Sequence, residues 1–329
     1  MKKIIYSIVF VCLFSLTLSG CGQSKTEEIR VAEVTHSIFY APLYVAIEKG
    51  FFEEEQINIE LTTTWGGDKT MTALLSGGSD IALVGSETSI YVYNQGTDDP
   101  VINFAQLTQT DGTFLVSRDE TESFSWNDLK GSTFLGQRKG GMPQMVGEFV
   151  LKQKQINPHH DLTLIQNVDF ANIANAFASG TGDYVQLFEP TASIFEQEGL
   201  GQIVASFGKE SVQIPYTTFM SKQSYLKENE ESVQRFTKAL FRAQTWVAEH
   251  SAQEIAKVIQ PQFKDTSLEI IEIVIERYKE QNSYSLNPIL DEKEWNNLQI
   301  IMDEANELRQ YVDHETLVKT SIANEVSGQ

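Results

Sequence analysis

The segment from residue 29 to residue 61 has the pattern of a strand, a helix and a second strand. Apolar residues alternate at both of its ends, which is typical of strands. Between them, Pro42 opens an apolar stretch that stops at Gly50. Proline in the first turn and glycine just past the last turn are typical of a helix. A strand–helix–strand unit predicts an α/β fold, in which ligands bind beyond the carboxyl ends of the strands.

The turn after the first strand holds the first candidate ligand-binding residues, His36, Ser37 and Tyr40. A neutral imidazole at position 36 could bond a ring nitrogen of a ligand, and capping of the next helix is the alternative role. Aromatic residues recur at the predicted strand ends, where about half of them are expected to face a ligand. Trp65 and Tyr216 are candidates for this reason. A flat ligand ring gains about 0.5–1.5 kcal/mol from each such aromatic partner.

Strand and helix patterns run through two successive units and then give way to helices. The first unit ends with predicted strands at 101–107 and 114–117, and the second cycle begins near residue 126. We expect the C-terminal helices to pack back on the first unit, as they usually do in two-lobed binding proteins. The predicted first lobe comprises residues 29–117 and 222–329, and the predicted second lobe comprises residues 118–221. Chain crossings near Val116 and Phe219 would then form a hinge.

Two short stretches, one in each unit, echo each other. SGGSDIALVGSE ends at Glu87, and SGTGDYVQLFEP contains Glu189. Both have a helix end, an aspartate four residues after a serine, a strand and then a glutamate. A helix end followed by glycine, aspartate and a strand is a common pattern, so coincidence is the alternative to an internal duplication. If the duplication holds, Glu87 (beside Thr88) and Glu189 lie at equivalent strand ends, where they would accept hydrogen bonds from an amine.

A glycine-rich loop, GQRKGGMPQ, precedes the predicted helix that begins at Pro143. Its backbone N–H groups, with Arg138, could bind an anion or a carbonyl, and a plain strand-to-helix turn is the alternative. The sequence contains no G-x-S-x-G, H-E-x-x-H or Walker motif. His159 and His160 are adjacent but lack a partner cluster. We therefore expect no enzymatic activity, no cofactor and no metal site.

The C-terminal third is predicted to be helical, with apolar stripes at helical spacing. Thr266, with Glu269 three residues later, predicts a capping box at the start of one helix. Asp291, followed by Glu294, predicts the cap of the next.

Two phrases of the sequence, APLYVAIEKGFFEEEQINIEL and ALLSGGSDIALVGSE, resemble those of a known protein family. It is the NMT1/THI5-like family, the extracellular solute-binding proteins of the thiamine-precursor and sulfonate group. In that family a helix ending in Lys/Arg-Gly-Phe/Tyr-Phe precedes a Gly-x-x-Asp-Ile/Val phrase. The resemblance extends over nearly the whole mature chain. It implies a two-lobed, type II periplasmic-binding-protein fold, each lobe a doubly wound sheet with flanking helices.

The resemblance also implies a function. A monomeric receptor would capture a small organic molecule between its lobes and deliver it to an ABC permease and its ATPase. A pyrimidine precursor of thiamine is the leading ligand; a sulfonate or another small organic acid, or a role as an extracellular sensor, is the alternative. The family's cytosolic pyrimidine synthase needs a cysteine-rich segment, whereas the only cysteines of this chain are Cys12 and Cys21.

The first twenty residues have the pattern of a bacterial lipoprotein signal peptide. Lys2 and Lys3 precede an apolar run that is too short for a membrane span, and Leu18–Cys21 matches a lipobox. We expect Cys21 to carry a lipid and residues 21–28 to tether the protein to the outer face of the membrane. Removal of the two lysines changes the formal net charge from −20 to −22, which disfavours nucleic acid as a partner.

Overall fold

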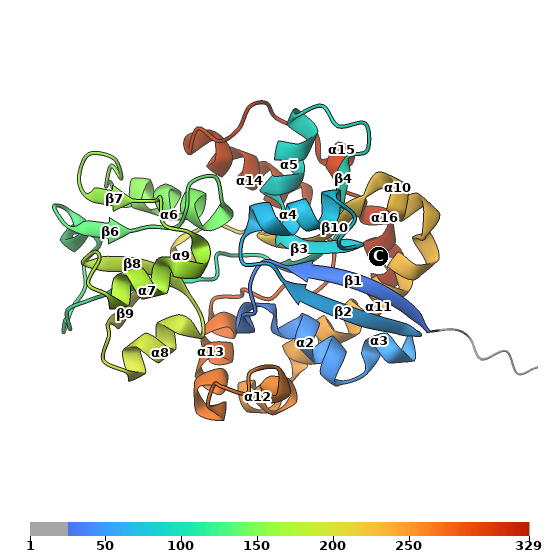
Figure 1. The fold of residues 1–329 in the computed structure, drawn as a ribbon, viewed down its shortest axis with the longest axis horizontal. Coiled ribbons are helices and arrows are strands. Elements are labelled where there is room, and N and C mark those ends of the chain that lie inside the picture. Colours follow the sequence, from blue (N-terminus) through green and yellow to red (C-terminus); the bar gives the residue numbers. More distant parts are fainter. Residues whose placement is uncertain (1–25, 329) are drawn as a thin grey trace, which may run out of the picture.

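The computed structural model describes residues 26–328, which form two α/β lobes (Figure 1). Each lobe is built on a five-stranded sheet. The first sheet has the order β2–β1–β3–β10–β4, with β1 Glu27–Glu33, β2 Ile57–Thr63, β3 Ile81–Gly85, β4 Val101–Thr108 and β10 Thr217–Lys222. The second has the order β7–β6–β8–β5–β9, with β5 Thr113–Ser117, β6 Thr133–Leu135, β7 Thr163–Ile165, β8 Tyr184–Phe188 and β9 Gln202–Ser206.

The two sheets have the same plan. In the first, β1 is parallel to β2 and β3, and β10 is antiparallel to β3 and β4. In the second, β6 is parallel to β7 and β8, and β5 is antiparallel to β8 and β9. β3 and β8 therefore occupy equivalent positions. The two-lobed α/β fold expected from the sequence is confirmed.

The lobe boundaries differ from the expected ones by one strand at each crossing. β5 was expected in the first lobe but pairs within the second sheet, and β10 was expected in the second lobe but pairs within the first. The chain therefore crosses between the sheets at residues 109–112, after β4, and again before β10. Alternating apolar residues identify a strand but not its partners, which only the hydrogen-bond pairing reveals.

Helices flank both sheets. Those of the first lobe are η1 Ile38–Tyr40, α2 Ala41–Glu48, α3 Phe51–Glu54, α4 Gly67–Leu75 and α5 Glu87–Asn94. Those of the second are η2 Trp126–Leu129, α6 Met142–Gln153, η3 Phe170–Asn172, α7 Ile173–Ala178, α8 Thr191–Gln197 and α9 Phe207–Glu210. The C-terminal ones are α10 Gln223–Glu228, α11 Glu230–Glu249, α12 Ala252–Ile259, η4 Gln260–Gln262, α13 Leu268–Glu280, α14 Glu292–Glu304, α15 His314–Leu317 and α16 Thr320–Ser327.

The C-terminal helices pack mainly on the first lobe. α11 lies against α2 and α3, and α16 lies against α11 and β4. α13 lies at the junction, where it contacts η1 of the first lobe and α8 of the second (Figure 1). The apolar stripe of α11 supplies buried side chains to the first-lobe core, where Phe236 packs on Phe52 and Phe219 with ring centroids 5.0 and 5.1 Å apart.

Local signals in the sequence set most helix boundaries. Pro42 lies in the first turn of α2, and Gly50, just after that helix, adopts a left-handed φ of 70°. Asp291 caps α14 by accepting a hydrogen bond from the Lys293 N–H, as expected. The cap of α13 is Ser267 and not Thr266, because the Ser267 hydroxyl accepts the hydrogen bond from the Ile270 N–H.

The predicted leader and its cysteine lie outside the residues that the structure describes. Within residues 26–328, no helix combines the length and the apolar character that a membrane crossing requires.

Candidate functional site

A cavity of about 250 Å³ lies between the two lobes. Its first-lobe wall comes from the ends of β1 and β3 and the starts of α4 and α5. Its second-lobe wall comes from the loop before α6 and the end of β8. Strand ends and helix starts of both sheets thus meet at one place, where α/β folds typically bind ligands.

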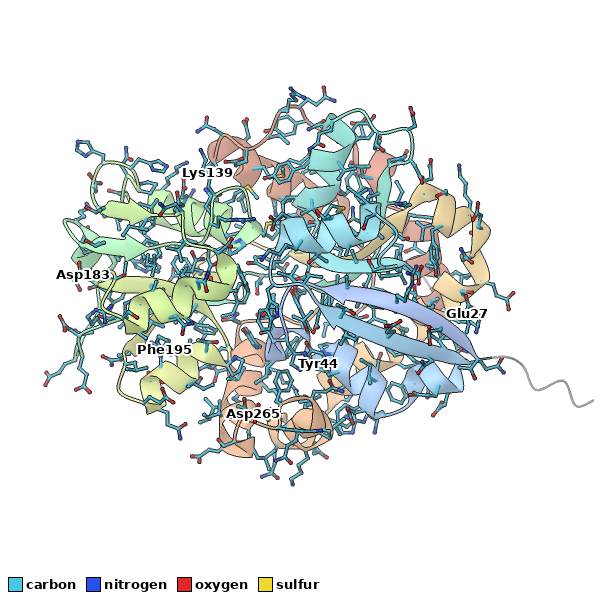
Figure 2. The ribbon with its side chains drawn as sticks, viewed as in Figure 1. Glu27, Tyr44, Lys139, Asp183, Phe195 and Asp265 are labelled. Atoms are coloured by element: carbon cyan, nitrogen blue, oxygen red, sulfur yellow. The ribbon has the colours of Figure 1, made fainter. Side chains whose placement is uncertain are left out.

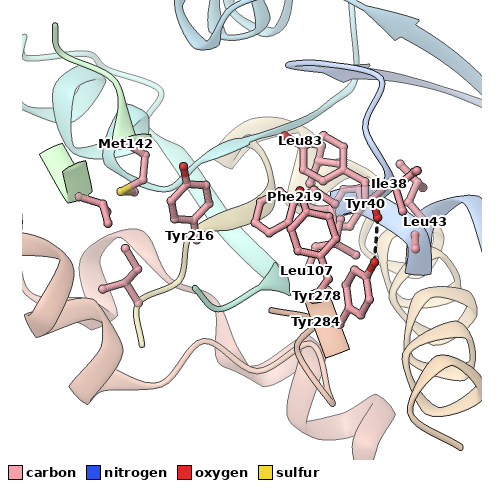
Figure 3. Packing of buried hydrophobic residues seen from close by; sticks show 14 of the residues in the cluster. Ile38, Tyr40, Leu43, Leu83, Leu107, Met142, Tyr216, Phe219, Tyr278 and Tyr284 are labelled. Atoms are coloured by element: carbon pink, nitrogen blue, oxygen red, sulfur yellow. Dashed lines mark hydrogen bonds between the residues drawn. The ribbon is translucent and has the colours of Figure 1, made fainter. Parts of the chain in front are cut away.

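Five of the sequence-predicted site residues line this cavity: Tyr40, Glu87, Thr88, Arg138 and Tyr216. They come from both lobes and, for Tyr216, from the segment directly before β10. Figure 3 shows Tyr216 between Met142 of the second lobe and the packed cluster around Tyr40. The structure brings these residues together, and their contact with a ligand remains a prediction.

His36 and Ser37 do not line the cavity but bond neighbouring segments of the chain. The two ring nitrogens of His36 lie 2.9 Å from the Glu33 carboxylate and 2.9 Å from the Gln262 carbonyl. The Ser37 hydroxyl accepts a hydrogen bond from the Phe39 N–H and donates one to the Glu189 carbonyl, at 2.5 Å. These side chains therefore have structural partners in place of a ligand.

Trp65 and Glu189 also lie off the wall. Trp65 is 46% exposed and directly precedes the wall residue Gly66. The Glu189 carboxylate is buried, accepts hydrogen bonds from the N–H and the hydroxyl of Ser193, and lies 2.8 Å from the Arg277 guanidinium. Burial raises the pKa of Glu189, and the charge of Arg277 opposes this rise. Glu189 thus anchors the start of α8 to α13.

The carboxyl group of Glu87 is the main polar feature of the cavity wall. The residue is 3% exposed, and its Oε1 accepts a hydrogen bond from the Met142 N–H across the cleft, at 3.2 Å. Its Oε2 has no hydrogen-bond partner within residues 26–328. Burial raises the pKa of this carboxyl to about 7, against the opposing effect of its backbone hydrogen bonds.

Gly85 makes room for that carboxyl group. A Cβ at position 85 would lie 2.1 Å from Glu87 Oε2, a distance that no side chain can adopt without displacing the carboxylate. The absence of a side chain at the end of β3 therefore lets the carboxylate fold back over the strand end.

Both basic side chains on the wall are paired with acids. Arg138 lies 2.7 Å from the Asp68 carboxylate and 3.1 Å from that of Asp169. Lys139, labelled at the upper edge of the second lobe in Figure 2, lies 3.7 Å from Glu307. The Arg138–Asp68 and Lys139–Glu307 pairs join the second lobe to the rest of the molecule.

Two N–H groups next to the start of α6 already have side-chain partners. The Gly140 N–H donates to the side chain of Gln144 at 2.9 Å, and the Met142 N–H donates to Glu87. A carboxylate at a helix N-terminus is stabilised by the helix dipole. The first-lobe carboxylate thus occupies a position that an anionic ligand would otherwise use.

Several wall residues were not predicted from the sequence. Tyr91 lies one helical turn after Glu87, so helical spacing could have identified it. Phe170, which packs on Phe188 with ring centroids 5.9 Å apart, follows no strand and carried no such signal. Asp68, in the first turn of α4, is a further wall residue, and it pairs with Arg138.

Comparison with known proteins places this site in context. The family model described as NMT1/THI5 like matches residues 38–254. A protein of Bacillus subtilis (strain 168) named as a binding protein, YtlA, is 63% identical over 325 residues, which are 97% of each chain.

Solved structures with the same fold are more distant in sequence. The alkanesulfonate-binding protein SsuA from Xanthomonas axonopodis pv. citri, bound to MOPS, has a TM-score of 0.72 and 17% identity, with 91% of this chain and 100% of that chain covered. The nitrate-binding protein NrtA from Synechocystis PCC 6803 has a TM-score of 0.69 and 17% identity, with 92% and 89% covered.

Proposed function

The chain belongs to the NMT1/THI5-like family of solute-binding proteins, and from this premise we propose that it delivers a small flat amine to an ABC importer. As a solute-binding protein of ABC-type import systems, it captures a small molecule and hands it to the permease. Delivery depends on a difference in ligand affinity between the closed and open forms of the protein.

The main observation in favour of an amine ligand is that Oε2 of Glu87, on the cavity wall, has no hydrogen-bond partner within residues 26–328. A buried acceptor without a partner destabilises the ligand-free protein by about 1–3 kcal/mol, and a ligand N–H group removes that penalty. The Tyr216 side chain lines the same wall, with its hydroxyl beside the buried carboxyl group of Asp111. An amine that donates to Glu87 therefore satisfies the unpartnered acceptor on this wall.

The shape and composition of the wall support a flat ring. Tyr40, Tyr91, Phe170, Phe188 and Tyr216 supply aromatic surface on several sides of the cavity. A volume of about 250 Å³ is slightly below the range of about 300–1,000 Å³ typical of sites for drug-sized molecules. An aminopyrimidine precursor of thiamine combines a small flat ring with an exocyclic amine, and it is our leading candidate.

Calorimetric titration with a hydroxymethyl-substituted 4-aminopyrimidine tests this assignment. We expect binding to the wild-type protein and a loss of about ten- to a hundredfold in affinity for Glu87→Gln, because a hydrogen bond to a charged group contributes about 1.5–3 kcal/mol. Absence of binding to the wild-type protein would exclude this ligand. Equal affinity in the two proteins would remove Glu87 from the ligand site.

A sulfonate or another small organic anion is the second candidate. It is supported by the ligand named for SsuA and by the presence of Arg138 on the cavity wall. The acidic partners of Arg138 and the ionised form of Glu87 both oppose an anion. Titration with ethanesulfonate under the same conditions separates the two candidates.

We also propose that Cys21 carries a lipid that anchors the protein to the outer face of the membrane. The lipobox and the polar residues after it support this proposal. Cys21→Ala should abolish fatty-acid labelling and leave the protein either released or unprocessed. Labelling that persists in Cys21→Ala would contradict the anchor.

A further inference from the structure

The two basic residues on the cavity wall are adjacent in the chain, and each pairs with an acidic residue outside the second lobe. Arg138 contacts Asp68 of α4, and Lys139 contacts Glu307 after α14. Arg138 is also bonded to Asp169 of its own lobe. Its guanidinium is therefore held between two carboxylates, one from each lobe.

The charges of Arg138 and Asp68 stabilise each other. Partial burial raises the pKa of Asp68, but the hydrogen bond and the charge of Arg138 outweigh this effect and leave the pKa below its ordinary value. The hydrogen bond that Arg138 donates to Asp68 is also the largest cause of the raised pKa of Arg138. Both groups are ionised at neutral pH, so the positive charge at the wall is compensated locally.

We propose that Asp68 is a specificity-determining residue, which compensates the charge of Arg138 at the cavity wall and so excludes small organic anions. This inference rests on the proposed function, because it takes the cavity between the lobes as the ligand site. An anion that approaches Arg138 must compete with carboxylates already bonded to the guanidinium. It must also approach Glu87, whose carboxylate occupies the N-terminus of α6.

The effect of Asp68 on anion binding depends on its position beside Arg138 and not on the net negative charge of the whole protein. Asp68 and Arg138 are 54% and 40% exposed, so the pair is screened by water and by salt. The charge of Arg138 acts over short distances under these conditions. Removing its direct partner should therefore matter more than removing a distant acid of equal charge.

Binding of ethanesulfonate to the purified protein, measured by calorimetry, tests the proposal. We expect Asp68→Asn to raise ethanesulfonate affinity about fivefold over wild type, the equivalent of about 1 kcal/mol. The gain should be larger in Asp68→Asn/Asp169→Asn, should disappear when Arg138→Gln is added, and should shrink as salt is increased. A change in folding alone would not be reversed by Arg138→Gln or by salt.

Glu54→Gln is the matched control. Glu54 is also in the first lobe, is 58% exposed and lies 2.7 Å from an arginine, Arg242, that does not line the cavity. The variant has the same change in net charge and should bind ethanesulfonate as the wild type does. Equal ethanesulfonate affinities of Asp68→Asn and Glu54→Gln would show that Asp68 does not exclude anions. This conclusion would hold whatever the aminopyrimidine titration shows. Failure of the proposed function is read separately, from absence of aminopyrimidine binding to the wild type.

Discussion

Glu87 makes the stability of the ligand-free protein depend on pH. Burial raises the pKa of its carboxyl group to about 7 in the folded chain, from an ordinary value of 4.5. Between these two values the unfolded chain loses the proton while the folded chain keeps it, so stability falls as pH rises through this window. Above about pH 7 the carboxyl group is ionised in both the folded and the unfolded chain, and the loss of stability reaches its full size. The difference between the two pKa values corresponds to a loss of roughly 3 kcal/mol in the free energy of unfolding.

Urea unfolding at pH 5 and pH 8 checks this prediction. The wild-type protein should be less stable at pH 8, and Glu87→Gln should lose about 2–3 kcal/mol of that pH dependence, because an amide does not ionise. Burial also raises the pKa of Asp111, to about 6, so this residue likewise lowers stability as pH rises. Asp111 is present in both proteins, and its effect therefore remains in Glu87→Gln. An unchanged pH dependence in Glu87→Gln would show that the carboxyl group is hydrated or ligand-paired in solution.

Sequence reasoning located some residues of the cavity wall from their place after a strand end, and their contact with a ligand stays a prediction. Tyr40, Glu87 and Arg138 follow β1, β3 and β6, and the carboxyl ends of these strands point to the cleft. His36 fits the same rule but lies off the wall, because Glu33 and Gln262 bond both of its ring nitrogens. The sequence could predict that His36 follows a strand. It could not predict that Gln262, more than two hundred residues away, takes one of the ring nitrogens.

At the scale of elements, β3–α5 and β8–α8 show how equivalent units diverge. Both strands occupy the third position of their sheets, as the repeated sequence pattern suggested, and a glutamate follows each. Glu87 faces the cavity, whereas Glu189 faces α13 and pairs with Arg277. The difference comes from α13, which packs against α8 and supplies Arg277 as the partner of Glu189, and no local pattern encodes this contact.

Glu189→Gln should lower stability without changing ligand affinity. The substitution leaves Arg277, a partly buried cation, with Glu196 as its remaining carboxylate partner. We expect a loss of about 1–3 kcal/mol, less than for a fully buried pair, because the Arg277 side chain is 27% exposed. Urea unfolding and aminopyrimidine titration of Glu189→Gln, beside Glu87→Gln, measure the two effects. Weaker aminopyrimidine binding with unchanged stability would show instead that Glu189 contacts the ligand.

The elements themselves were largely predictable, and their pairing was not. Alternation and caps placed most strands and helices, including α14 with its Asp291 cap. β5 and β10 were correctly expected as strands but assigned to the wrong lobes, because each belongs to the sheet on the far side of a crossing. Strand pairing depends on long-range hydrogen bonds, and a single sequence gives no measure of them.

At the scale of the whole molecule, the crossing at residues 109–112 is fastened to the C-terminal end of α13 and the segment after it. The Tyr278 hydroxyl donates to the Gly112 carbonyl at 2.9 Å, and the Gln281 side chain donates to the Asp111 carbonyl at 3.1 Å. The Gln109 N–H donates to the Ser283 carbonyl at 2.9 Å. These bonds give the lobes a fixed pivot, so a change in shape should occur as rotation about it.

The contacts across the cleft indicate that the structure is the closed form. Asp68–Arg138 and the Glu87–Met142 hydrogen bond both need the lobes to be close together. The Asp68–Arg138 pair is exposed, and such pairs contribute about 1 kcal/mol or less. The Glu87–Met142 contact is buried, but it is a single hydrogen bond of 3.2 Å. The closed form therefore needs a ligand to become dominant, and small-angle scattering can detect the shift.

We expect the radius of gyration to decrease when a saturating aminopyrimidine is added, with no change in molecular mass. The scattering curve calculated from the structure should then fit the ligand-bound data better than the ligand-free data. Arg138→Gln removes one cross-cleft contact and should shift the ligand-free population further toward the open form. Identical curves with and without the ligand, at a saturation verified by calorimetry, would show that the two lobes are rigid. Delivery would then need a signal to the permease other than closure.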